Sequence, residues 1–128
     1  MSEGRAGGPH LPSPSPIDAY GNGGFRFAGM SHRGSLLCFP DGIWAWPINR
    51  LAELSVAKLD GVFARAGTLD FFLIGAGIDP WVLPEPLVAR FREAALPVDA
   101  MTTGAAVRTY NILLAENRRA GAGLIAVE

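Results

Sequence analysis

Residues 69–77 read LDFFLIGAG, an apolar run that closes on two glycines. The part from 69 to 74 shows no regular alternation of polar and apolar residues. Strands of this composition are typical of parallel sheets that are covered on both faces. The run therefore predicts an inner strand of an α/β domain, and Gly75 and Gly77 predict a tight turn at its carboxyl end.

Helical and extended patterns alternate along the chain after this run. Apolar residues at helical spacing predict an amphipathic helix over 85–95, and a short strand is expected at 98–101. The longest helix is expected from 103 to about 118, and a last strand at 124–127. Strand–helix–strand order of this kind indicates parallel strands joined by right-handed crossovers.

The chain before residue 69 is richer in turn residues. Ser55 can cap a helix that ends near Gly67. Further upstream, short strands separated by turns predict an antiparallel β-meander. The expected strands are 24–28, 35–39 and 43–47, with turns at 31–34 and 40–42. We therefore expect a mixed sheet with helices on one face and the meander covering part of the rest.

Length and composition bound the class of protein. The chain has 128 residues, of which 49% are hydrophobic, and this suits one domain with a real core. We expect residues 1–16, rich in Gly, Pro and Ser, to form a disordered tail, and residues 17–128 to form a single domain. The sequence has no secretory signal and no apolar stretch near the ~20 residues that span a bilayer, so we expect a cytoplasmic protein. A net charge of −1 argues against a nucleic-acid binder.

Few residues could support catalysis. His10 and His32 are the only histidines, and Cys38 is the only cysteine. Cys38 lies in the apolar run 36–39, which favours a buried thiol over a nucleophile. The chain has no hydrolase nucleophile elbow, phosphate-loop lysine motif or His-x-x-x-His pair. We therefore expect no metal and no cofactor, and the sequence favours a binding protein over an enzyme.

The first candidate site lies where two expected strands end. If strands 69–74 and 98–101 are neighbours, the loops after them face one crevice, the place where open α/β sheets bind ligands. The start of the long helix adds unpaired backbone N–H groups, which favour an anion or a small carboxylate. The residues expected to line the crevice are Gly75, Gly77, Thr102, Thr103 and Gly104. The alternative is that these residues form tight turns with a threonine as the helix cap.

The surface of the long helix is the second candidate. Its core stripe is expected to contain Ala106, Val107, Tyr110, Leu113 and Leu114. Asn111 and Arg118 lie on the flank of this stripe, where they could add polar contacts to the crevice or form a polar patch with Arg108. Ile112 points away from the stripe and could meet a partner. The alternative is that Asn111 satisfies buried backbone groups while the arginines are solvated.

Trp44 and Trp46 form a third candidate. They share one face of their expected strand, with Ile43 and Ala45 on the other. An exposed tryptophan face would mark a partner surface. The alternative, in which this face packs under the meander, stays open.

Four stretches of the chain stand out in combination. They are 17–25 (IDAYGNGGF), Trp46-Pro47, 73–77 (LIGAG) and 109–119 (TYNILLAENRR), the last preceded by Ala105 and Ala106. Together they resemble an uncharacterised-domain family that includes mitochondrial complex I assembly factor 3 and small bacterial proteins, and the resemblance spans about residues 17–126. The family usually has a threonine between the two glycines, where this chain has Ala76, so the expected crevice lacks that hydroxyl.

The resemblance implies a three-layer α/β fold with a mixed central sheet, into which the N-terminal meander and the C-terminal strand–helix units fit. It also implies no established enzymatic activity, and mitochondrial relatives that help to assemble the respiratory NADH dehydrogenase through protein contacts. We therefore expect a non-enzymatic interaction or assembly-factor-like domain, with a protein partner such as a membrane-complex subunit or another assembly factor. The expected partner surface is Trp44, Trp46, Arg108 and Ile112. The alternative is a small-anion binder or enzyme that uses the crevice.

Overall fold

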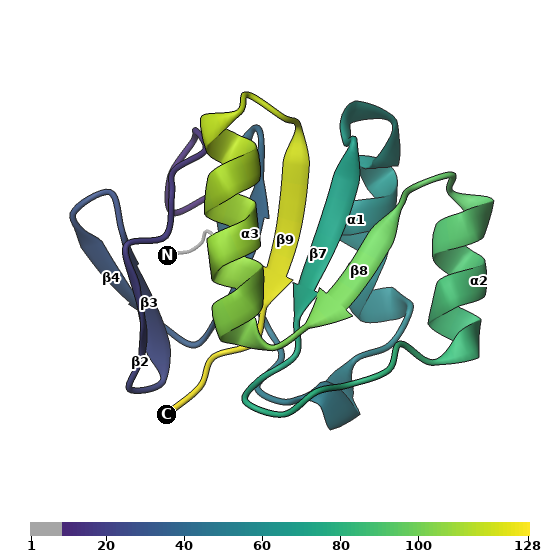
Figure 1. Cartoon of the computed structure of the whole chain (residues 1–128), viewed down its shortest axis with the longest axis horizontal. Helices are drawn as coiled ribbons and strands as arrows, with labels where there is room; N and C mark the ends of the chain where they lie inside the picture. Colours follow the sequence, from purple (N-terminus) through teal and green to yellow (C-terminus); the bar gives the residue numbers. More distant parts are fainter. Residues whose placement is uncertain (1–8) are drawn as a thin grey trace.

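The computed structural model describes residues 9–128, which form a five-stranded mixed sheet, a three-stranded sheet and three α-helices (Figure 1). The strands of the large sheet are β5 (Ser35–Phe39), β6 (Gly42–Trp46), β7 (Phe71–Gly75), β8 (Val98–Met101) and β9 (Ala120–Leu124). They lie in the order β6-β5-β9-β7-β8, and β5 is antiparallel to both of its neighbours. β7 pairs in parallel with β8 and β9, so the apolar run after residue 69 has the predicted inner position.

The N-terminal strands form the smaller antiparallel sheet. Its members are β2 (Ala19–Gly21), β3 (Gly24–Phe27) and β4 (Met30–Arg33). The expected meander is therefore divided between two sheets, because the hairpin of β5 and β6 belongs to the large one. The turn predicted at 31–34 is wrong, since β4 extends to Arg33 and the chain turns at Ala28 and Gly29, which both have positive φ. Every second residue of β4 is exposed and polar, so the strand lacks a clear apolar signal.

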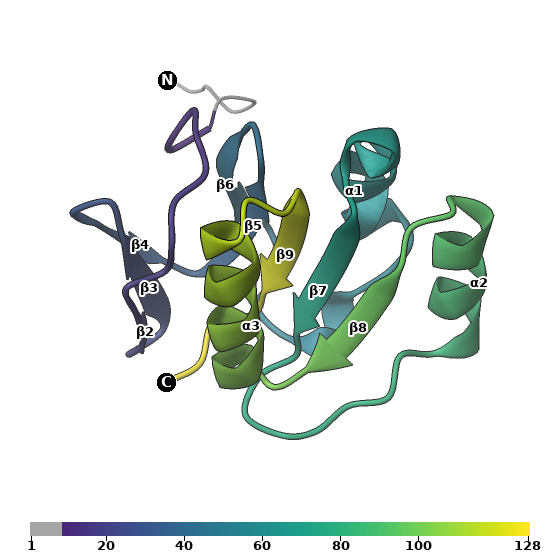
Figure 2. The ribbon, with the colours of Figure 1, turned by 45° about the horizontal axis from the view of Figure 1, so that its top comes forward.

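The helices lie on both faces of the large sheet. They are α1 (Asp60–Ala64), α2 (Glu85–Glu93) and α3 (Thr103–Ala115), with short 3-10 turns at Leu51–Glu53, Ala57–Leu59 and Ala66–Thr68. α3 and the small sheet pack on one face, whereas α1 and α2 pack on the other (Figures 1 and 2). The three-layer α/β fold is confirmed, but the expectation of helices on one face only is wrong.

β7 explains why both faces carry helices. Phe71 and Leu73 contribute to the cluster under α3, whereas Phe72 and Ile74 contribute to the cluster under α1 and α2. A strand with large apolar side chains on both faces is stable only when both faces are removed from water. The unbroken apolar pattern of this run therefore required cover on each side.

β9 has an unusual composition for a central strand, because its first four residues are alanine and glycine. All five of its residues are buried. A Cβ at Gly123 would lie 2.8 Å from Trp46 Cζ3 and 3.2 Å from Phe72 Cζ, so the glycine leaves room for two aromatic rings. The strand predicted at 124–127 is therefore misplaced, because small residues have low strand propensity even where close packing demands them.

The tail expected at 1–16 falls partly on residues 1–8, which lie outside the described residues. Within the described part, His10 N donates a hydrogen bond to Ile43 O at 2.8 Å. Ile43 N donates to Leu11 O at 2.9 Å, so Leu11 forms an isolated bridge with β6. No helix between residues 9 and 128 has the length and apolar character needed to cross a membrane.

Candidate functional site

The glycine turn after β7 lies directly beside the start of α3. Gly75 of β7 is in register with Met101 of β8, so the two strands end at the same edge of the sheet. Ala76 N donates to Met101 O at 2.7 Å, and Thr103 N donates to Gly77 O at 2.8 Å. The two loops that the sequence predicted to face one crevice are therefore hydrogen-bonded to each other.

Thr103 is a structural junction in this arrangement. Its side chain is fully buried. The hydroxyl accepts a hydrogen bond from Gly77 N at 3.0 Å and donates one to Ile125 O at 2.7 Å. The side chain thus joins three segments of the chain, and its hydroxyl is engaged by the protein itself.

Gly75 allows α3 to approach the sheet. A Cβ at this position would lie 3.1 Å from Thr103 Cα, 3.2 Å from Ala106 Cβ and 3.0 Å from Leu124 Cδ2. These distances are tighter than ordinary van der Waals contact, so a larger residue would push the helix away from β7. Gly75 and Thr103 therefore lie inside the packed core at the base of the expected crevice.

The open part of the crevice is a hollow of about 210 Å³ at the N-terminus of α3. It is lined by Tyr20, Gly77, Ile78, Thr102, Gly104, Arg108 and Val127. Thr102 is the helix cap, and its hydroxyl accepts a hydrogen bond from Ala105 N at 3.3 Å. Arg108 brings a cation to the hollow, although the sequence assigned it to the partner surface. Tyr20 was not among the predicted residues, because its position depends on how β2 packs against α3.

Asn111 and Arg118 lie away from this hollow. Asn111 Oδ1 accepts a hydrogen bond from Ile17 N at 2.8 Å, and its Nδ2 donates to Ile17 O at 2.9 Å. Arg118, beyond the C-terminal end of α3, has its Nε 3.9 Å from a carboxylate oxygen of Asp70. Of the seven residues proposed for the crevice, three therefore line the hollow, two lie in the core beneath it and two lie elsewhere on α3 or just after it.

Asp70 and Arg119 form an ion pair at the opposite end of the sheet, just before β7 and β9, which the sequence did not predict. Arg119 Nη2 lies 2.9 Å from Asp70 Oδ1, and Arg119 N donates to Asp70 Oδ2 at 3.2 Å. The hydrogen bonds from Arg119 lower the pKa of the Asp70 carboxyl group below its ordinary value. A single aspartate and a distant arginine give no spacing signal in the sequence, so this pair could not be found before the strands were placed.

The tryptophan face of β6 belongs to the core. Trp46 is only 2% exposed, and its Nε1 donates to Lys58 O at 3.0 Å. Trp44 is partly buried, with the Arg65 guanidinium 4.6 Å from its ring centroid. The cover comes from the segment around α1 and not from the meander.

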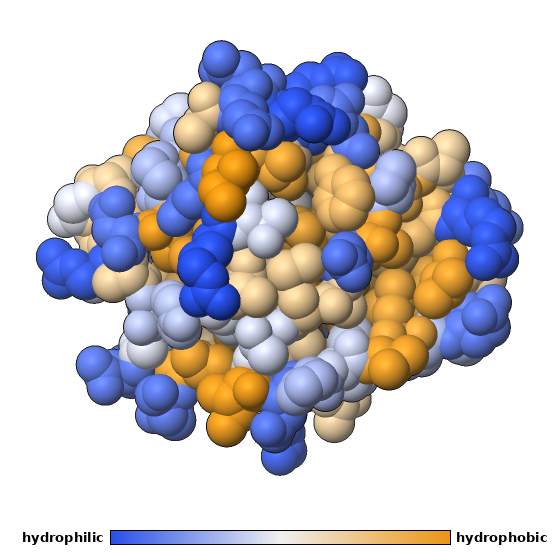
Figure 3. Space-filling view, viewed as in Figure 1, coloured by the Kyte–Doolittle hydropathy of each residue, from blue (hydrophilic) through white to orange (hydrophobic). Residues whose placement is uncertain are grey.

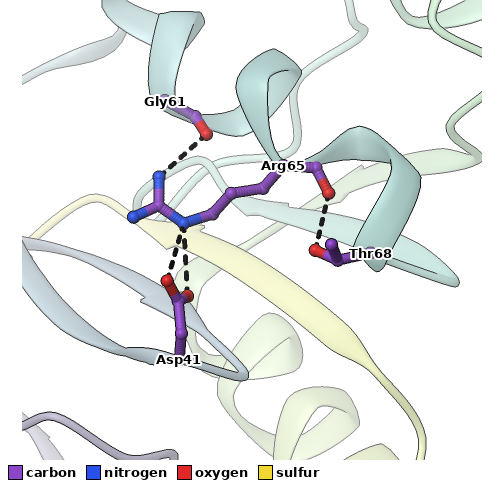
Figure 4. Close-up of polar contacts among 4 residues, drawn as sticks. All are labelled: Asp41, Gly61, Arg65 and Thr68. Atoms are coloured by element: carbon purple, nitrogen blue, oxygen red, sulfur yellow. Dashed lines mark hydrogen bonds and ion pairs between the residues drawn. The ribbon is translucent and has the colours of Figure 1, made fainter.

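Arg65 fixes this cover in place (Figure 4). Its Nε donates to Asp41 in the turn between β5 and β6 at 3.2 Å, and its Nη1 donates to Gly61 O at 3.1 Å. Arg65, held by Asp41, therefore covers Trp44, and Trp46 is buried beside Lys58. Arg108 and Ile112 of the proposed partner surface, by contrast, are exposed on α3.

The environments of Cys38 and of the two histidines differ. Cys38 is buried, and this raises the pKa of its thiol to about 12. The His32 ring lies 4.7 Å from the His10 ring, and burial together with the charge of His10 lowers the pKa of His32. Between residues 9 and 128 there is no group of three His, Cys, Asp or Glu side chains placed to hold a metal ion.

Comparison with known proteins gives the family. The profile of a protein family of unknown function, DUF498/DUF598, matches residues 17–125, and the chain belongs to this family. An uncharacterised protein of Rhodobacter capsulatus is 40% identical over 111 residues, which cover 86% of this chain and 83% of that protein. A crystal structure of a Bartonella henselae protein, described as an outer membrane protein, superposes with a TM-score of 0.88 at 46% identity. It covers 93% of this chain and 100% of that one.

The family also contains more distant relatives with a named role. NADH dehydrogenase [ubiquinone] 1 alpha subcomplex assembly factor 3 of Danio rerio is 25% identical over 109 residues. The match covers 85% of this chain and 63% of that relative, so the chain spans less than two thirds of the assembly factor. The resemblance predicted from the four sequence stretches is thereby confirmed.

Proposed function

We propose that this chain is a protein-binding domain without catalytic activity that assists the assembly of a respiratory membrane complex. The observation that carries the proposal is the likeness to assembly factor 3, which extends over 85% of the chain. The likeness covers the α/β domain and is not limited to one motif. Burial of Cys38 also supports the proposal, because a thiol with a raised pKa is a poor nucleophile.

The outer surface of α3 supports a role in protein binding. Ile112 is 58% exposed, although large apolar side chains are favoured in the core. Arg108 lies one turn earlier on the same helix and is also exposed. Apolar side chains and arginines side by side are typical of protein–protein interfaces. We therefore assign the partner surface to α3, with Arg108 and Ile112 as its members and without the two tryptophans.

The proposal is tested by deleting the gene in its source organism. Membranes are then solubilised in mild detergent, separated on a native gel and stained for NADH dehydrogenase activity. The deletion is expected to lower the amount of the assembled complex and to leave subassemblies, and a plasmid copy of the gene should restore it. An unchanged amount of assembled complex in the deletion strain would remove the assembly role.

A second candidate function is the binding of a small anion in the hollow at the α3 N-terminus. The observation that favours it is the position of Arg108, whose cation lines the same hollow as the helix cap Thr102. Thermal unfolding with phosphate, sulfate, carboxylates and nucleotides tests this function, because a ligand of the folded state raises its melting temperature. The expected shift should disappear in the Arg108→Ala variant, and the absence of a shift with every anion would exclude this function.

A further inference from the structure

The face of the large sheet that carries α3 is only partly covered. α3 packs mainly against β7 and β9, and the small sheet lies beyond it on the side of β5. β8 is the edge strand, and no helix lies over it on this face (Figure 1). The space-filling view from the same direction shows mostly hydrophobic residues on this side of the molecule, with a hydrophilic one among them (Figure 3). One position in the helical layer is therefore vacant within the described residues.

A groove of about 280 Å³ occupies this position between α3 and β8. Its lining residues are Phe71, Leu73, Asp99, Met101, Thr109, Leu113 and Arg118. Phe71, Met101 and Leu113 are partly buried and pack against the core cluster under α3, so the groove continues the apolar core to the surface. Ile112, which precedes Leu113 on α3, is 58% exposed and is not one of the lining residues.

Asp99 places one negative charge in this apolar groove. Its residue is exposed, and no hydrogen bond or ion pair engages its carboxylate within residues 9–128. Arg118 lines the same groove, but its Nε lies 3.9 Å from Asp70. An apolar partner that covered Asp99 without a cation would leave a desolvated, unpaired charge, which is strongly unfavourable.

We propose that this groove, the α3–β8 groove, binds an amphipathic helix of a partner protein that carries a lysine or arginine facing Asp99. The inference rests on the proposed function and names the contact through which it acts. A helix suits the length of the groove. The bordering strands β7 and β8 span about 15 Å, and a helix of about ten residues, or three turns, has the same length. Helices in one layer pack 8–10 Å apart, so the partner helix would lie alongside α3 with its apolar stripe on Leu113 and Met101.

The contact is first mapped by photocrosslinking in living cells. The crosslinking amino acid p-benzoylphenylalanine replaces Thr109 in the full-length chain, because Thr109 lines the groove. A second version carries it at Val82, which is 88% exposed and is not part of the groove. Adducts are digested and sequenced by mass spectrometry. The Thr109 position is expected to give an adduct with a segment that has apolar residues at helical spacing and a basic residue among them.

The charge pair is then tested with a synthetic peptide of the crosslinked segment and the purified chain. Asp99→Lys should weaken binding at least about tenfold, as expected for reversal of a partly desolvated pair, and Asp99→Asn should weaken it less. Changing the basic residue of the peptide to glutamate should restore most of the affinity for Asp99→Lys. Circular dichroism and unfolding curves that match those of the natural chain confirm that both variants fold.

Several outcomes overturn the inference. They are a Thr109 adduct with a second copy of this chain, an adduct with a segment lacking a basic residue, or equal peptide affinity for Asp99→Lys and the natural chain. A partner that is captured only from Val82 would also overturn it and would leave the proposed function intact. If neither position gives an adduct and the deletion strain assembles the respiratory complex normally, both the groove inference and the proposed function are refuted.

Discussion

The side-chain amide of Asn111 pairs with both backbone polar groups of Ile17. It accepts a hydrogen bond from Ile17 N at 2.8 Å and donates one to Ile17 O at 2.9 Å, as a neighbouring strand would. The two residues are 94 positions apart, and Ile17 is buried in the core cluster under α3. The contact therefore anchors the segment that leads into the small sheet to the middle of α3.

Replacement of Asn111 by leucine should loosen the attachment of the small sheet. The variant leaves the N–H and C=O of Ile17 without partners, which we expect to lower the free energy of unfolding by about 2–3 kcal/mol. Urea denaturation of the variant and of the exposed control Glu116→Ala measures the difference. Equal stability of the two variants would mean that the Ile17 backbone finds other partners.

Thr103 should tolerate serine better than valine. Valine has nearly the same shape but leaves Gly77 N and Ile125 O without the hydroxyl, which should cost about 3 kcal/mol of unfolding free energy. Serine keeps both hydrogen bonds and removes one methyl group, for which we expect about 1 kcal/mol. The midpoints of urea unfolding give the order of stability of the two variants. A valine variant as stable as the serine variant would show that the two hydrogen bonds of the Thr103 hydroxyl do not stabilise the fold.

Substitution of Gly75 by alanine should be destabilising for reasons of space. The added methyl group would lie 3.0–3.2 Å from atoms of Leu124, Thr103 and Ala106, which predicts a loss of about 1–3 kcal/mol. Gly67→Ala is the matched control, because a Cβ there meets no atom within 4 Å. Calorimetry measures the melting temperatures of both variants. Equal melting temperatures for Gly75→Ala and Gly67→Ala would show that α3 is not packed tightly against Gly75.

The Asp70–Arg119 pair should make stability depend on acid pH. The hydrogen bonds from Arg119 lower the pKa of Asp70 in the folded state below the ordinary value of 3.8. A carboxyl group with a lowered folded-state pKa stabilises the protein above its unfolded-state pKa, and this contribution is lost as the pH falls through the folded-state value. The stability difference between the natural chain and Asp70→Asn should therefore stay constant near neutral pH and should shrink as the pH falls below the ordinary aspartate pKa of 3.8.

Urea unfolding at a series of pH values measures this difference. The exposed carboxylate Asp79 provides the control, because Asp79→Asn removes a charge that is outside the pair. A gap between the natural chain and Asp70→Asn that stays constant down to the lowest pH would show that folding does not lower the pKa of Asp70.

Part of the fold could be predicted because some segments have residue patterns that are typical of one element. The apolar run in β7 predicted an inner strand, and the glycines after it predicted the turn that meets α3. Other elements gave weak signals for physical reasons. β4 is mostly polar at the surface, and β9 is built from alanine and glycine because Trp46 and Phe72 occupy the space beside it.

The candidate site was harder to predict, because spacing along α3 does not determine what each side chain meets. Asn111 and Arg118 lie seven residues apart, yet one contacts the backbone of Ile17 and the other lies near Asp70. Tyr20 and Asp99 gave no signal, since each acquires its place only when its strand packs beside α3. The sequence pattern predicts that the two loops meet, but it does not distinguish their buried residues, Gly75 and Thr103, from those that line the open hollow.

The most direct test of the account asks whether the exposed surface of α3 is needed for complex assembly. The gene-deletion strain is complemented with Ile112→Glu or with Val82→Glu, which changes an exposed apolar side chain away from α3. Both proteins should be folded and present at equal amounts on immunoblots. The account predicts that Val82→Glu restores the native-gel band of NADH dehydrogenase and that Ile112→Glu leaves it reduced at least about threefold, because the new carboxylate would be desolvated in the contact without a partner. Full restoration by Ile112→Glu would contradict it.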